Sequence, residues 1–302
     1  MAGPSGGIEA SAQSELLLER IEHLIRGRSS TDRHMGYVWM LVPILPVLVA
    51  LALVISFIGI LASALSSIGN LQQPQNALRA VGAILGLYGI AIASLYIILL
   101  IGAFGFYFLV DRRNSHFKRQ QELFLNLQRH LASNTKFAAS DNLFQLAQAS
   151  EDSIFNERDR PAGLWSIMYL FVTPIVGLIL AYNLNQDLRR HEDLQSRYED
   201  RLAKALNETA GQSVTLASSR SHKRDPILFM VLTAITGGLF WIYWFYTLLK
   251  DYNEHFLDQS HFEDQILRLL KPQPSNTACV ACGGFVPEKA KFCPQCGKKQ
   301  TG

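Results

Sequence analysis

All four cysteines of the chain lie near its C-terminus, in two Cys-x-x-Cys pairs ten residues apart. Two such turns can bring four thiolates to one tetrahedral ion, the ligand set of a structural zinc site with no open position for catalysis. Iron is the alternative metal, because four thiolates also suit iron. We predict a zinc ribbon over residues 279–302, in which a structural Zn²⁺ is bound by Cys279, Cys282, Cys293 and Cys296. A metal site in place of disulfides implies a reducing compartment for this end of the chain.

A second group of candidate residues recurs in three places, each after an apolar segment. The pattern is Tyr, eight residues, His, three residues, Gln, and its copies are Tyr107–His116–Gln120, Tyr182–His191–Gln195 and Tyr246–His255–Gln259. Apolar residues follow at matching offsets, namely Leu123 and Leu127, Tyr198 and Leu202, and Phe262 and Ile266. Steps of four, three and four residues place all of these on one face of a helix. The sequence therefore predicts that His and Gln lie on the buried face of three related helices.

Two interpretations of these histidines stay open. The last two copies carry Asp187 and Asp251 four residues before the His, and an aspartate and a histidine so spaced could bind a metal together. Alternatively, the buried His and Gln side chains hydrogen-bond neighbouring helices and fix how these dock. The first copy has Arg112 at the aspartate's position, which favours the structural interpretation.

The chain carries no recognisable motif of an enzyme. We find no Ser–His–Asp arrangement, P-loop, HExxH motif or Rossmann glycine pattern. A metal-dependent site built from Asp187, His191, Asp251 and His255 is the only catalytic candidate, and an enzyme is not expected. The mild net charge of +3 does not favour a nucleic-acid-binding protein.

Four segments without any charged residue must position these groups. They are 37–68, 80–110, 162–184 and 226–249, and all 28 Lys and Arg and all 25 Asp and Glu lie outside them. Spanning a bilayer takes about 20 apolar residues. Helices of soluble proteins are amphipathic and usually shorter. We predict an all-α integral membrane protein of the cell membrane.

The order of apolar and polar stretches predicts the organisation of the chain. The second apolar segment follows the first after a short turn with Arg79 as its only charge, which predicts a transmembrane hairpin whose turn is not cytoplasmic. The predicted parts are an N-terminal tail with a short helix (1–36), the hairpin (37–110), polar helices (111–161), two membrane segments each followed by a polar helix (162–270), a linker (271–278) and the zinc ribbon (279–302).

The last two apolar segments allow two topologies. If both cross the membrane, the polar tail 185–225 lies on the opposite side from the other tails. Each segment also has a helix breaker near its middle, at Thr173–Pro174 and at Thr236–Gly238, so each could re-enter as a helical hairpin. Both topologies are multi-pass and place the N- and C-termini in the cytoplasm, where the basic residues of the polar parts are expected.

The segment TGGLFWIYWFY, the DYNEHF sequence after it and the terminal zinc ribbon carry a resemblance. With these features the chain resembles multi-span membrane proteins of archaea and bacteria that have no known activity, over roughly residues 160–302. The resemblance implies a prokaryotic, and especially an archaeal, membrane protein. It supplies no catalytic residue.

These features predict a membrane-anchored scaffold or adaptor that presents a cytoplasmic helical layer and a zinc ribbon to protein partners. The expected partners are the lipid bilayer, a protein bound by the ribbon or by the polar helices, and a second copy of the chain. The alternative is a subunit of a transporter or channel. The lack of intramembrane charge argues against ion-coupled transport, whereas re-entrant segments would suit it.

Overall fold

A computed structural model gives the arrangement of the chain. It describes residues 5–66, 74–133, 141–210, 216, 224–271, 277–278, 285–286, 292 and 298–299. The elements are α1 (Ser5–Arg26), α2 (Arg28–Thr31), the 3-10 helix η1 (Tyr37–Met40), α3 (Leu41–Ser66), α4 (Pro74–Ser133), α5 (Asp141–Asn156), α6 (Ala162–Phe171), α7 (Thr173–Ala210), α8 (Pro226–Ile235), α9 (Phe240–Leu270), β1 (Thr277–Ala278) and β2 (Phe285–Val286). Apart from the two short strands the fold is helical, which confirms the all-α prediction.

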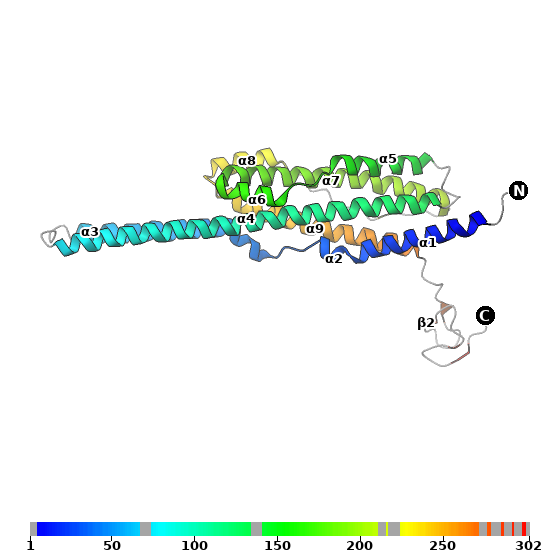
Figure 1. Cartoon of the computed structure of the whole chain (residues 1–302), viewed down its shortest axis with the longest axis horizontal. Coiled ribbons are helices and arrows are strands. Elements are labelled where there is room, and N and C mark those ends of the chain that lie inside the picture. The colour runs from blue at the N-terminus through cyan, green and yellow to red at the C-terminus, as the bar shows by residue number, and fades with distance from the viewer. Residues whose placement is uncertain are drawn as a thin grey trace.

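Helices α3 and α4 project together from one end of the molecule (Figure 1). By length and composition, Tyr37–Ser63 and Val81–Ser133 could each cross a membrane. The most apolar stretch of each helix is not buried inside the protein. Large side chains such as Leu51, Ile55 and Leu85 are more than half exposed. A contiguous apolar surface of this size needs a nonaqueous partner, so the two helices point to a membrane location.

The other two apolar segments each fold into two helices rather than one. In the third, the helix breaks at Val172, and the Tyr169 ring of α6 lies against Gly177 of α7. In the fourth, Gly237 and Gly238 have φ values of 60° and 94°, a left-handed conformation that suits glycine. Phe229 then packs on Trp244, with ring centroids 5.8 Å apart. Each segment is thus a helical hairpin whose two ends lie on the same side.

The polar part of α4 runs beside α7 and α9, and α1 and α5 pack on this bundle (Figure 1). One apolar cluster lies at the hairpin end and includes Phe106, Leu180 and Trp244. Another lies farther along and includes Tyr198 and Phe262. The described polar tails of the second, third and fourth apolar segments are therefore packed together.

The burial predicted for the recurring pattern is confirmed. All three His, all three Gln and the six apolar residues that follow them are at most 3% exposed. Two boundaries differ from the prediction: α1 is longer than the short N-terminal helix expected, and each polar tail continues the apolar helix before it without a break. Residues favourable to helix on both sides of the apolar–polar boundary, with no Pro or Gly between them, account for this continuity.

The predicted zinc ligands Cys279, Cys282, Cys293 and Cys296 lie outside the described residues. In their neighbourhood the structure describes β1, which pairs antiparallel with β2, and an isolated bridge between Phe292 and Lys299. The zinc ribbon stays a prediction.

Candidate metal centre

The three histidines of the recurring pattern meet at one point in the bundle. His116 comes from α4, His191 from α7 and His255 from α9, and one ring nitrogen of each lies within 4.8 Å of the others. The ring centroids are 4.9 to 5.3 Å apart and the ring planes are steeply inclined to one another. All three residues are at most 1% exposed. They meet because the helices run in the same direction and each carries His nine residues after a tyrosine near the end of its apolar segment.

A carboxylate faces Nδ1 of each imidazole. Asp32 lies 2.9 Å from Nδ1 of His116, and Glu157 lies 2.7 Å from Nδ1 of His191. Glu192 lies 3.7 Å from Nδ1 of His255. At His116 and His191 the carboxylate is within hydrogen-bond distance, so it favours the proton on Nδ1 and the lone pair on Nε2, as the second shell of a metal-bound histidine does.

The opposite ring nitrogens of His116 and His191 are buried. Within the described ranges, Nε2 of His116 and Nε2 of His191 have no hydrogen-bond partner. A buried polar atom without a partner costs about 1–3 kcal/mol, so such atoms are rare. A metal ion bound by the three imidazoles would satisfy both.

The protonation states of the surrounding groups suit a cation. Burial lowers the pKa of His116 and outweighs the opposing effect of Asp32, which favours the neutral form that a metal ligand requires. Burial alone would raise the pKa of Asp32, but His116 and Arg119 hold it well below its usual value. For Glu157 too, the effect of burial is outweighed, here by His191 and Ser153, and its pKa is lowered. The centre is thus bordered by ionised carboxylates.

Asp187 and Asp251 are not in this centre. Asp187 receives two hydrogen bonds from Arg160, at 2.5 and 2.8 Å, and pairs with Arg113 at 3.1 Å. Asp251 is paired with Arg224. The hypothesis of a metal site shared between each aspartate and the histidine four residues later is therefore wrong, although His191 and His255 do belong to one candidate site.

The glutamines of the pattern form a layer one helical turn beyond the histidines. Gln195 donates to Oε1 of Gln259 and to Glu199, and Gln259 donates to Glu263. This agrees with the predicted role of Gln in helix docking. Gln120 differs, because both of its amide atoms are buried and neither has a hydrogen-bond partner within the described part of the chain.

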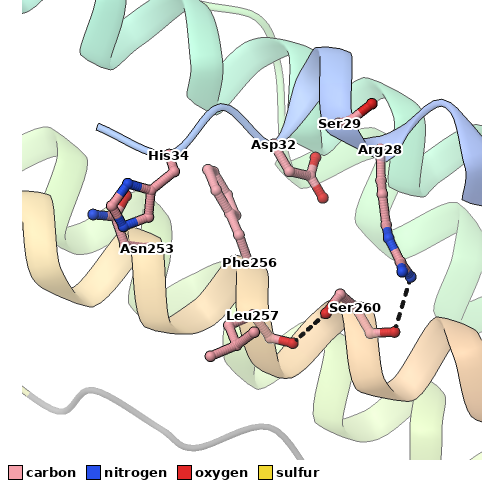
Figure 2. Close-up of a pocket in the computed structure, with 8 residues that line it drawn as sticks. All are labelled: Arg28, Ser29, Asp32, His34, Asn253, Phe256, Leu257 and Ser260. Carbon is pink, nitrogen blue, oxygen red and sulfur yellow. Dashed lines mark hydrogen bonds between the residues drawn. The ribbon is translucent and has the colours of Figure 1, made fainter. Parts of the chain in front are cut away.

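A pocket of about 270 Å³ adjoins the centre (Figure 2). It lies between α9 and the segment from Arg28 to His34, and its other lining residues are Ser29, Asp32, Asn253, Phe256, Leu257 and Ser260. The Phe256 ring is 4.4 Å from the His116 ring, measured between centroids. Arg28 is fixed in the wall by Asp264 and by the Ser260 carbonyl. The inner wall of the pocket, made by Asp32 and Phe256, thus contacts a candidate ligand directly.

Comparisons of the chain with protein-family models, with curated proteins and with solved structures found no match. The chemistry therefore rests on the geometry of the centre. Three imidazoles suit Zn²⁺, Cu, Fe and Ni, and a site with three protein ligands keeps a further coordination position.

From the sequence, the candidate metal ligands were His191 and His255, each with the aspartate four residues before it. The structure brings these two histidines together with His116 instead. The signal for His116 as the third ligand was the equal spacing of Tyr, His and Gln after three apolar segments. This spacing brings the three histidines together only if the three tails lie on one side. Asp32 and Glu157 come from segments outside the recurring pattern, and no sequence signal would have found them.

Proposed function

We propose that the protein is a membrane-anchored metalloprotein whose helical bundle binds one divalent transition-metal ion through His116, His191 and His255. The observation that carries this proposal is the convergence of three buried imidazole nitrogens within 4.8 Å. Nε2 of each imidazole would bind the metal, because Nδ1 faces a carboxylate.

The charge of the surroundings supports a divalent cation. Asp32, Glu157 and Glu192 border the histidines and are nearly buried. Arg119 pairs with Asp32 at 2.6 Å but also with the buried Glu263, at 2.7 Å. Buried carboxylates are stable only with compensating charge. Three imidazolium ions this close together would repel one another, whereas one metal ion supplies two positive charges to three neutral rings.

The proposed anchor is the α3–α4 hairpin, which crosses the bilayer twice. The α6–α7 and α8–α9 hairpins enter from the same side, since α6 and α8 have ten residues each and reach only about 15 Å. Exposed apolar side chains at their tips, such as Phe171 and Ile235, support partial insertion. The bundle, both termini and the metal centre then lie on the cytoplasmic side, in agreement with the Lys and Arg content of the polar tails.

The scaffold function is part of the same proposal. The bundle holds the metal centre at the membrane surface, and the C-terminal zinc ribbon, with Cys279, Cys282, Cys293 and Cys296 as ligands, presents a second surface to a protein partner. The resemblance to multi-span prokaryotic proteins agrees with this arrangement.

Metal analysis tests the proposal. The full-length chain with all four cysteines replaced by serine is purified in detergent, so that the ribbon cannot bind metal. We expect one metal ion per chain, and its loss in His116→Ala, His191→Ala and His255→Ala. His261→Ala is the matched control, because His261 also lies on α9 but is exposed, and it should keep the metal. Absence of metal from the cysteine-free protein, or retention in the triple alanine variant, would contradict the proposal.

A further inference from the structure

The candidate metal centre has three protein ligands, which leaves a fourth coordination position to account for. Structural zinc sites are closed by four protein side chains, whereas three-ligand sites hold an exchangeable water or substrate. Around the three imidazoles the neighbouring carboxylates are engaged at Nδ1, and Asp187 and Asp251 are paired with arginines. Asp32, Glu157, Asp187 and Asp251 therefore already have partners.

Gln120 is a buried polar group beside the histidines that could hold a fourth ligand. It lies one turn after His116 on the same face of α4 and is 1% exposed. Neither its Nε2 nor its Oε1 has a hydrogen-bond partner among the described residues, whereas Gln195 and Gln259 are hydrogen-bonded to each other. An amide can donate to an anion or accept from a water. A small ligand on the metal would satisfy a group that is otherwise costly to bury.

The pocket in Figure 2 shares two lining residues, Asp32 and Phe256, with the surroundings of His116. It opens between the Arg28–His34 segment and α9, and the Phe256 ring stands between it and His116, which it contacts at 4.4 Å. Phe117 makes a comparable contact on the other side, stacked on His191 at 4.0 Å, but does not line the pocket. Rotation of the one ring of Phe256 would connect the pocket with the centre.

We infer that the bound metal keeps a fourth, exchangeable position for water or a small anion, held by Gln120 and reached through the pocket when Phe256 moves. This inference rests on the proposed metal centre and makes that centre reactive rather than structural. The ligand class is limited to small species, because the position is enclosed by imidazole, phenylalanine and amide side chains.

The test uses the full-length, cysteine-free protein loaded with Co²⁺, whose visible absorption reports its coordination. Titration with azide should give a saturable spectral change. Gln120→Leu should weaken azide binding about tenfold or more, because a hydrogen bond to a charged ligand is lost. Gln259→Leu removes an equally buried amide that is already hydrogen-bonded to protein groups, and should leave azide affinity within about threefold of the parent's.

Kinetics test the route. Phe256→Ala should accelerate both azide binding and removal of Co²⁺ by a chelator by about tenfold, with little change in azide affinity. Phe117→Ala, the matched control, removes an equally buried ring that contacts a histidine but not the pocket, and should not accelerate either process.

The outcomes separate the two proposals. If Co²⁺ binds but azide at saturating concentration changes no spectrum, the fourth position is closed and the inference is wrong, while the metal centre stands. If Phe256→Ala and Phe117→Ala accelerate exchange equally, the pocket is not the route. If the cysteine-free protein binds no Co²⁺ at all, the proposed metal centre itself fails.

Discussion

Replacement of Glu157 by Gln should weaken metal binding without unfolding the bundle. Oε1 of Glu157 lies 2.7 Å from Nδ1 of His191, and both side chains are only 2% exposed. The amide keeps the shape of the carboxylate and its oxygen still accepts a hydrogen bond from Nδ1 of His191. Without the negative charge, it no longer raises the basicity of the imidazole. Loss of such a second-shell carboxylate costs about 10- to 100-fold in metal affinity, or roughly 1.4 to 2.7 kcal/mol.

The assay is competition for Zn²⁺ between the cysteine-free protein and a chelating dye, with helical content monitored by circular dichroism. The control is Glu122→Gln, which removes one negative charge from an exposed pair with Arg20. Its effect on affinity should stay within about twofold, because exposed ion pairs contribute little. Equal affinity of Glu157→Gln and the parent protein, with both fully helical, would refute the assignment of Glu157 as the group that orients His191.

Three further predictions concern the fold around the centre. Asp187→Asn should lower the thermal midpoint measurably, because it leaves two arginines without their carboxylate, yet keep one metal per chain; loss of metal from folded protein would restore Asp187 as a ligand. Gly102→Leu should destabilise the bundle by about 1–3 kcal/mol, because a Cβ there would lie 2.6 Å from a tyrosine ring of α6, whereas Gly86→Leu in open space should not. In the cysteine-free background, an impermeant thiol reagent applied to intact cells should label a cysteine at Gln75 but not one at Ser196; labelling at Ser196 would mean that the third segment crosses the membrane.

The pattern of the sequence was enough to predict the helical class and the burial of the recurring residues. Period and burial are local properties, because His116 and Gln120 fall on the apolar face of their helix whatever the helix packs against. The continuity of α4 from its apolar part into its polar part was harder to predict, since the change in composition resembles a domain boundary but does not break the helix.

The composition of the candidate metal centre depends on contacts between distant parts of the chain. His116 and His255 are separated by the third segment, and whether they can meet His191 depends on whether that segment turns back at Val172. Asp32 reaches the centre from the residues after α2, which show no pattern at all. Which acids face an imidazole and which face arginine is decided by helix rotation in the bundle, so the sequence offered Asp187 and Asp251 as equally good ligands.

X-ray absorption at the metal edge tests the central claim most directly. Measured on the cysteine-free protein loaded with Zn²⁺, the spectrum should show three imidazole nitrogens at about 2.0–2.1 Å and one further light atom. The outer-shell scattering of the three rings should diminish in His116→Ala. A first shell of oxygen atoms without imidazole scattering, unchanged in that variant, would contradict the tri-histidine centre.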